Sequence, residues 1–537
     1  MINQLKNLVK GRGPEILILL LALLLRTVLL GIKPPHFDEG VNGWFVDQMV
    51  KQGYFKYDPG NYHGPLHFYV LFLSLELFGR NLWAIRLPIV LVSTLCVWMV
   101  LRFERFFGKP VCQYAALAMA VSPAMVFYGR YAIHESWLVL FLLMLTWGIF
   151  ELWRAGSVTG LYATVYGATG MILTKETYII HFVCLGLAWI TWKIAQLIVP
   201  TEKLPVAQQK WKLRDLATTV AIALVLIVFF YTGNFLLPWE PSLKNLYHTF
   251  TYWEKTGQAG QSGHEKPAYD ISWLTYHYNS GHGASVHQEQ FAVNYYWFYL
   301  LFRYEWPALI GAVAAFFMIA RGVNGRLRFL AIYGFGAIAA YSLVRYKTPW
   351  CIISLMWPLL FLFGWVMQRL TKLTKPVTAA CVGGVILLAS FADSLWLNFS
   401  HYTDENEPYV YVQTFKDINR VVDPLLALAK YDPKNYHLNG NFIVSSYYPL
   451  PWMLGDFTNI GYYGIDVTPN PVDADFLLIE KPRCEDVERR LKNAYFKERV
   501  QLRASQDPCD LLLSYDKFHI LFPGRDPEVN PDRANLE

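Results

Sequence analysis

Charged residues are scarce in this chain. They make up 16% of its 537 residues, against about 25% in an ordinary soluble protein. This shortage excludes a disordered chain, and 47 Lys and Arg residues are too few for the dense basic face of a nucleic-acid-binding domain. Hydrophobic residues make up 54% of the sequence, and the mean hydropathy is +0.25. Together these values indicate a protein that crosses a membrane several times.

The few charges are unevenly distributed. Residues 1–400 contain 32 Lys and Arg but 19 Asp and Glu, a balance of +13, whereas residues 401–537 contain 15 and 22, a balance of −7. We therefore expect a membrane domain over 1–400 and a soluble domain over 401–537. In the second part, strands are predicted at the apolar runs 442–444, 476–479, 510–513 and 518–522, and helices at 410–428 and 485–496. This alternation predicts a small α/β domain.

Eleven apolar runs in the first part are long enough to be considered as membrane helices, each about 20 residues. They are residues 14–32, 83–101, 111–129, 137–153, 158–174, 177–199, 216–236, 306–320, 327–344, 350–367 and 376–397. The run Leu66–Phe78 is shorter and contains His67 and Glu76, so an interfacial helix is predicted there. With this assignment every second loop is basic, which predicts a cytoplasmic N-terminus and an extracytoplasmic C-terminal domain.

Cysteine is also rare, with seven residues in the chain. Five lie in or beside the apolar runs, and only Cys484 and Cys509 fall in the C-terminal domain. These two could form a disulfide in an oxidising compartment, or remain separate thiols; both alternatives stay open.

The first predicted outer loop contains two adjacent carboxylates, Asp38 and Glu39, immediately beyond a membrane helix. A carboxylate in such a place can act as a base or bind a cation. The alternative is an acidic first turn of the helix that follows. Further along, Asp58 and His63 flank a Pro- and Gly-rich turn that adds a carboxylate and an imidazole at the membrane surface.

Other predicted outer loops also hold charges where few are expected. Arg130, His134 and Glu135 lie in one short loop, which either forms a self-neutralising pair or contributes to a divalent-metal site with Asp38. Lys175 and Glu176 interrupt a long apolar sequence, where charges are costly and usually functional or paired. Arg345 and Lys347 place cations at an outer membrane edge, against the positive-inside trend. A lipid phosphate would account for them; incidental cations beside an aromatic anchor are the alternative.

The order of these motifs resembles the GT-C superfamily of integral membrane glycosyltransferases, above all the protein O-mannosyltransferases and lipid A aminoarabinose transferases. The resemblance rests on Asp38-Glu39, on His63-Gly64-Pro65-Leu66 and Arg86-Leu87-Pro88, and on Lys347-Thr348-Pro349-Trp350. The tail motif Tyr448-Pro449-Leu450-Pro451-Trp452 is similar to a prokaryotic subgroup that has an outer C-terminal domain. His63-Gly64 and His134-Glu135 depart from the usual motifs of these families.

The resemblance implies transfer of a sugar from a polyprenyl-phosphate donor to a glycan, lipid or protein acceptor at the outer face of the prokaryotic cell membrane, with inversion. It implies that membrane lipids and the donor are partners and that nucleic acid is not. It assigns catalysis to Asp38 and Glu39, and it leaves a divalent metal on Asp38, His134 and Glu135 open. The implied donor-phosphate residues are Arg345, Lys347, Arg130 and Lys175, and the implied substrate-binding residues are Asp58, His63, His134, Glu135 and Glu176.

Two alternative functions remain at this stage. In a transporter or lipid flippase, buried charges such as Arg26, Lys175 and Glu176 would lie along the translocation path. That function predicts an internal repeat of hydropathy, and none is evident in the sequence. In a non-catalytic membrane scaffold, the outer-loop carboxylates would be dispensable.

Overall fold

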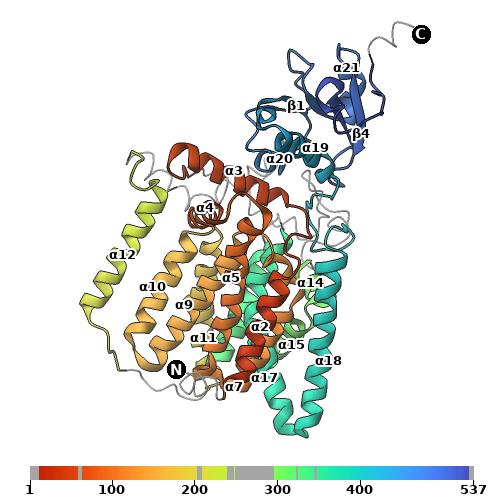
Figure 1. Cartoon of the computed structure of the whole chain (residues 1–537). Helices are drawn as coiled ribbons and strands as arrows, with labels where there is room; N and C mark the ends of the chain where they lie inside the picture. The colour runs from red at the N-terminus through yellow and green to blue at the C-terminus, as the bar shows by residue number, and fades with distance from the viewer. Residues whose placement is uncertain are drawn as a thin grey trace, which may run out of the picture.

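The computed structural model describes residues 11–57, 63–201, 208–238, 247, 296–321, 324–343 and 347–530. These residues form a bundle of long helices with a smaller sheet domain above one end (Figure 1). The first described helix begins at the opposite end of the bundle, so the N-terminal side of the chain and the sheet domain lie far apart (Figure 1).

Each of the eleven predicted membrane segments contains a helix of the bundle, but the segment 111–129 is not continuous: it is divided at Ser122 into Lys109–Val121 and Pro123–Tyr128. Six stretches of the described chain are long and apolar enough to cross a membrane, 82–107, 135–155, 178–198, 213–231, 349–373 and 376–400; the total number of crossings stays a prediction. The helices are α2 (Gly13–Thr27), α5 (Leu82–Arg102), α7 (Lys109–Val121), α9 (Glu135–Ala155), α10 (Val158–Ile172), α11 (Tyr178–Ile198), α12 (Leu213–Tyr231), α15 (Trp306–Arg321), α16 (Gly325–Leu343), α17 (Ile352–Leu373) and α18 (Pro376–Leu395).

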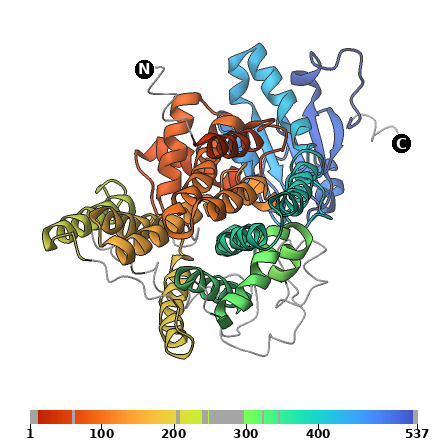
Figure 2. The ribbon, with the colours of Figure 1, turned by 90° about the horizontal axis from the view of Figure 1, so that it is seen from below.

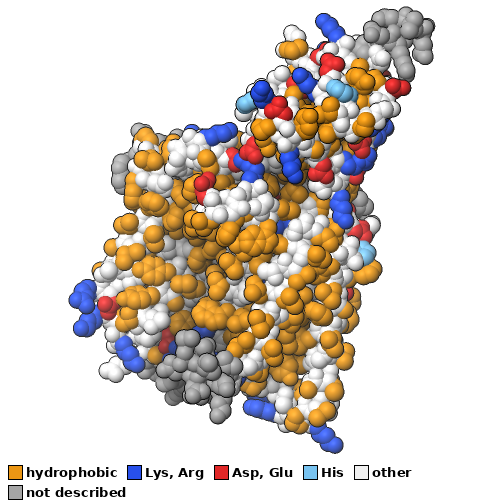
Figure 3. All heavy atoms as spheres, in the orientation of Figure 1, with side chains coloured by type: hydrophobic (Ala, Val, Ile, Leu, Met, Phe, Trp, Pro, Cys, Tyr) orange, Lys and Arg blue, Asp and Glu red, His pale blue; other side chains and the backbone are white. Residues whose placement is uncertain are grey.

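Apolar side chains cover the visible flank of the bundle, and charged side chains gather on the sheet domain and near the ends of the bundle (Figure 3). Seen from below, the helices do not form one ring: α12 lies at the rim, beside α10 (Figure 2). Short helices connect the long ones: α6 (Glu104–Phe107), α8 (Pro123–Tyr128), α14 (Tyr296–Tyr304), the 3₁₀ turn η4 (Pro349–Cys351) and the π turn η5 (Trp396–Ser400).

Two further helices, α3 (Phe37–Gln52) and α4 (Leu66–Phe78), lie across the end of the bundle beneath the sheet domain (Figure 1). At 13 residues, α4 has the length expected for an interfacial helix. Helix α3 begins with a capping box, in which the His36 side chain accepts the Asp38 N–H and the Glu39 carboxylate accepts the His36 N–H. It ends at Gly53, whose φ of 80° needs a residue without a side chain.

The C-terminal domain is a five-stranded mixed sheet with its own apolar core. The strand order is β2-β1-β3-β5-β4; β1, β2 and β3 are parallel, and β5 is antiparallel to β3 and β4. The elements are α19 (Ile418–Tyr431), η6 (Pro433–His437), β1 (Asn439–Ile443), α20 (Leu450–Met453), β2 (Asn459–Tyr463), β3 (Phe476–Glu480), α21 (Lys481–Glu488), β4 (Tyr495–Val500), β5 (Cys509–Ser514) and α22 (Tyr515–Phe518). The predicted α/β character is confirmed; Cys484 and Cys509 are both free thiols.

The sheet domain docks on α3 through two glycines. A Cβ added at Gly40 would lie 2.2 Å from the Cα of Pro449, and one added at Gly43 would lie 2.3 Å from the Trp452 ring. Trp452 is buried in an apolar cluster together with Val46 of α3 and residues of α4 and α5. The motif Tyr448–Trp452, singled out from the sequence, thus forms part of the contact between the two parts of the chain.

We expect Gly43→Ala to loosen this contact, because the added methyl group and the Trp452 ring cannot occupy the same space. Overpacking of this kind costs about 1–3 kcal/mol. Limited proteolysis of the detergent-solubilised protein should release the C-terminal domain faster than in the parent. Gly464→Ala is the control, since nothing lies within 4 Å of its added Cβ; equal release from both variants would contradict the contact.

Candidate active site

A small cavity opens where the loops that were predicted to face outward meet. It is lined by residues from four separate segments: Asp38, Val41, Asn42, His63, Ile133, His134, Glu135 and Trp350. Its volume is about 40 Å³, less than a sugar ring needs. The same cavity is therefore lined by four of the residues singled out from the sequence: Asp38, His63, His134 and Glu135.

The Glu39 carboxylate is fully engaged in an ion pair and hydrogen bonds that join separate loops. The carboxylate forms a bidentate ion pair with Arg86 of α5, at 2.7 and 2.6 Å. It also accepts the N–H groups of His36 and Ala132, at 2.9 and 3.0 Å. Burial alone would raise the pKa of Glu39, but the Arg86 guanidinium and these N–H groups hold it below its usual value. With both oxygens occupied, Glu39 is a structural anchor in this arrangement and not a free base.

The Asp38 carboxylate, unlike that of Glu39, is accessible to solvent. The side chain is 34% exposed, and its oxygen lies 3.7 Å from Nδ1 of His36. The His36 ring is fixed from the other side, since its Nε2 lies 2.7 Å from the carbonyl of Tyr411. Asp38 is thus a solvent-accessible carboxylate on a rigid helix start, at the wall of the cavity.

The glycine of the His63-Gly64-Pro65 turn permits a close backbone contact. His63 forms a β-bridge with Lys175, and the Gly64 N–H donates to the Thr174 carbonyl at 3.0 Å. A Cβ at Gly64 would lie 2.3 Å from the Leu173 carbonyl oxygen. This short pairing brings Lys175 to Glu135, and the two side chains form a buried ion pair. Burial lowers the pKa of Lys175, but the Glu135 carboxylate outweighs it and raises that pKa above its ordinary value.

Three imidazoles are in contact beside the cavity. The His134 ring lies 4.1 Å from those of both His63 and His67, measured between centroids. Within the described chain, neither nitrogen of His134 has a hydrogen-bond partner. Burial lowers the pKa of His134 well below its ordinary value and that of His67 to about 3, so both rings are neutral at physiological pH.

The cations predicted to bind a phosphate lie in different places. Lys347 is buried, and its ammonium donates to the Tyr341 and Ser342 carbonyls, at 3.0 Å each. Burial lowers the pKa of Lys347 to about 7. Arg130 lies outside the cavity, because its guanidinium donates to the Leu25, Val28 and Leu29 carbonyls at the end of α2. It is a helix-capping residue here and not a cavity residue. Arg345 and Asp58 fall outside the described residues.

Glu176 is buried away from the lining of the cavity and accepts the Tyr57 hydroxyl at 2.9 Å. Burial raises its pKa from 4.5 to about 7. A group with a raised folded-state pKa stabilises the protein below its unfolded pKa, and this stabilisation is lost as the pH rises through the folded value.

We therefore expect the thermal unfolding midpoint to fall between about pH 4.5 and 7 through the charging of Glu176. Glu176→Gln should make this fall shallower, because the amide does not titrate. The same change at Glu498, a half-buried residue of β4, is the control. Parallel pH curves for the parent and Glu176→Gln would contradict the assignment.

The structure adds residues that sequence reasoning did not single out as functional. Arg86 was quoted only as part of a family motif, yet it is the partner of Glu39. Lys33 is buried with its ammonium 3.8 Å from the Phe127 ring and 3.5 Å from the Tyr131 ring. Trp350 and Asn42 complete the lining of the cavity. A basic residue followed by Pro34-Pro35 was the only sequence signal for Lys33.

The metal ligands considered from the sequence do not form a closed site. Within the described chain, one group of three such side chains, Cys484, Glu488 and Asp510, has its donor atoms within 4.8 Å of one another. Asp38, His134 and Glu135 line one cavity but do not meet this distance. Asp510 is also paired with Lys497 and Arg499, so that group is explained by its ion pairs.

The fold and the position of the cavity define the class: this is an integral membrane protein with the GT-C fold, as the motifs in the sequence implied. Residues 62–232 match the family model "Dolichyl-phosphate-mannose-protein mannosyltransferase". ArnT from Cupriavidus metallidurans, solved with undecaprenyl phosphate, superposes with a TM-score of 0.61 at 15% identity, covering 94% of this chain and 98% of ArnT. Its apo form gives a TM-score of 0.56 over the same shares.

A curated relative matches part of the sequence. "Putative mannosyltransferase YkcB" of Bacillus subtilis is 26% identical over 219 residues, which are 37% of this chain. The matched region spans 31% of the length of that relative. The match with the family model covers the turn at His63, the loop of Glu135 and the pair Lys175-Glu176, but not Asp38 or Lys347.

Proposed function

We propose that this protein transfers a sugar from a polyprenyl-phosphate-linked donor to an acceptor hydroxyl at the outer face of the prokaryotic cell membrane. The observation that carries the proposal is the accessible Asp38 carboxylate, held at a cavity where the outer loops meet. The likeness to a fold solved with undecaprenyl phosphate supports a lipid-phosphate donor. The basic alternate loops favour a cytoplasmic N-terminus, with the sheet domain outside.

In the proposed reaction, Asp38 takes the proton from the acceptor hydroxyl. The acceptor oxygen then forms a bond to the anomeric carbon of the sugar, and the bond from that carbon to the phosphate oxygen breaks. The polyprenyl phosphate leaves with the electron pair of that bond. A single displacement of this kind inverts the configuration of the anomeric carbon.

The leaving phosphate gains negative charge, so nearby cations would stabilise the transition state. Lys347, with Arg345, is our first choice for this part, since a phosphate beside Lys347 would favour its charged form despite burial. Lys175 is a further choice, because it forms an ion pair with Glu135, which lines the cavity. Glu39 and Arg86 position the loop of Asp38 rather than react.

His63, His134 and Glu135 would contact the sugar, since they share the cavity with Asp38. Neutral imidazoles offer one donor and one acceptor each, which suits hydroxyl groups. The small volume means that these residues must separate when the donor binds.

The function is tested in two steps. Mass spectrometry of membrane glycolipids and glycoproteins, with and without the gene, should reveal one glycan that disappears. The purified protein in liposomes should then make that linkage from the matching polyprenyl-phosphate sugar, and NMR should find the anomeric configuration inverted. Retention of configuration would exclude the single displacement, and unchanged glycans in both fractions would exclude the proposed function.

A further inference from the structure

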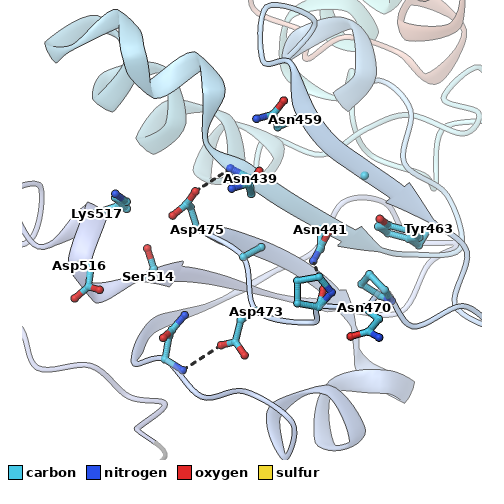
Figure 4. Close-up of a pocket in the computed structure, with 15 residues that line it drawn as sticks. Asn439, Asn441, Asn459, Tyr463, Asn470, Asp473, Asp475, Ser514, Asp516 and Lys517 are labelled. Carbon is cyan, nitrogen blue, oxygen red and sulfur yellow. Dashed lines mark hydrogen bonds between the residues drawn. The ribbon is translucent and has the colours of Figure 1, made fainter.

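A second cavity lies in the sheet domain, away from the one described above. Its volume is about 520 Å³, within the usual size of a small-molecule site. It is bounded by β1, β2 and the segments that precede β3 and follow β5 (Figure 4). The labelled side chains in Figure 4 surround one hollow, and they are amides, carboxylates, one hydroxyl, one ammonium and one aromatic ring.

The strands that form this cavity have an unusual composition. Asn439 and Asn441 of β1, and Asn459, Gly461 and Tyr463 of β2, all line it. These are alternate residues, so they share one face of the sheet. In the register of the sheet, Asn439 is opposite Asn459 and Asn441 is opposite Gly461. Asparagine and glycine are disfavoured in strands, so this polar face does not follow from the needs of the sheet.

Gly461 leaves room for an aromatic ring. A Cβ added there would lie 2.4 Å from the Tyr463 ring, which therefore lies over Gly461. On the opposite face of the same strands, Phe442, Ile460 and Tyr462 belong to or pack against the apolar core. The cavity thus lies on the other face of the sheet from that core, and its Tyr463 and Ala474 border a second, smaller apolar cluster.

One buried polar atom in the lining has nothing to bind within the described chain. Ser514, at the end of β5, is 5% exposed, and its hydroxyl has no hydrogen-bond partner there. Close by, one carboxylate oxygen of Asp475 accepts the Asn439 N–H at 2.8 Å. Leaving a buried hydroxyl unsatisfied is costly, so a ligand that reached the Ser514 hydroxyl would be stabilised by a hydrogen bond to it.

The lining excludes several ligand classes. Three carboxylates, Asp473, Asp475 and Asp516, against one ammonium, Lys517, disfavour an anion. A cation site is disfavoured as well, because Asp473 already accepts the N–H groups of Lys492 and Asn493 and the Tyr495 hydroxyl. Apart from Tyr463, the lining holds no large apolar side chain, which excludes a lipid tail.

We propose that this cavity binds a neutral carbohydrate. Amides and a free hydroxyl both donate and accept, as adjacent sugar hydroxyls require, carboxylates accept from them, and an aromatic ring offers a face to the C–H side of a sugar. Within the function proposed above, and resting on it, the bound sugar belongs to the acceptor glycan. Carbohydrate binding itself does not depend on that function.

The test uses the full-length protein in a detergent without a sugar head group, applied to an array of neutral, amino-sugar and uronic-acid oligosaccharides. Neutral oligosaccharides should be retained and uronic acids should not. Asn441→Ala and Asp475→Asn should each weaken binding about tenfold, the effect of losing a ligand hydrogen bond. Asn419→Ala, an amide lost from an exposed position of α19, is the matched control.

Thermal unfolding midpoints show whether each variant is folded. If Asn441→Ala is unstable, Asp516→Asn, at an exposed position, tests the same lining. Binding should persist in Asp38→Asn, which separates this inference from the proposed reaction. The inference is overturned if no neutral oligosaccharide binds, if Asp475→Asn and Asp516→Asn both bind like the control, or if calcium binds in place of sugar.

Discussion

Asp38→Asn is expected to lower the rate of sugar transfer by about 10²–10⁴-fold, the usual contribution of a general base. The amide has the shape of the carboxylate but cannot take the proton of the acceptor hydroxyl. Binding of the donor should change little, because the phosphate-binding residues are elsewhere. The measurement is single-turnover transfer in liposomes, at saturating donor.

The matched control is Asp47→Asn, the same change in the same helix. Asp47 forms an ion pair with Arg80 at 2.7 Å and does not line the cavity. It should therefore keep nearly full activity. Transfer by Asp38→Asn at the rate of this control would exclude Asp38 as the base.

The largest expected effect on stability comes from Arg86. Arg86→Leu would leave the fully buried Glu39 carboxylate without its counter-ion. Breaking a buried ion pair in this way costs about 3–5 kcal/mol, and Arg86 also supports the Leu30, Lys33 and Pro34 carbonyls. Thermal unfolding in detergent should show a large loss of stability or no folded protein at all.

Two further variants make this result interpretable. Adding Glu39→Leu to Arg86→Leu removes the stranded charge and should recover part of the loss. Arg420→Leu removes an exposed ion pair with Glu498 and should cost less than about 1 kcal/mol. If Arg86→Leu were no more harmful than Arg420→Leu, Glu39 would not be the anchor described here.

Much of the fold could be predicted because membrane helices follow directly from hydropathy. Each of the eleven predicted segments contains a helix, although 111–129 is broken at Ser122, and the shorter run at Leu66–Phe78 lies across the bundle. The sheet domain was harder. Strand β2 (Asn459–Tyr463) was missed, because its asparagine and glycine do not read as a strand. The predicted helix over 485–496 stops at Glu488, and β4 starts at Tyr495. The apolar run 518–522 is not a strand, since α22 ends there at Phe518.

The site was predictable only to the level of which loops matter. The cavity residues Asp38, His63, His134 and Glu135 come from loops far apart in sequence. The signal was that these polar residues stand in loops between apolar segments, where few charges are expected. The roles of Glu39 and Arg130 could not be read in this way, because they depend on partners in other segments. The Glu39 carboxylate is an anchor because it pairs with Arg86, 47 residues further along the chain. The adjacent Asp38 carboxylate is exposed to solvent and is free to react.

The packing of Pro449 on Gly40 and of Trp452 on Gly43 limits how freely the C-terminal domain can be exchanged. The helix that carries Asp38 is packed between the sheet domain and the bundle. Replacing the C-terminal domain would therefore change the contacts that position this helix. A domain taken from another protein would fit only if it brought a proline and a large aromatic ring to these two glycines. Chain length alone would not preserve the position of the carboxylate.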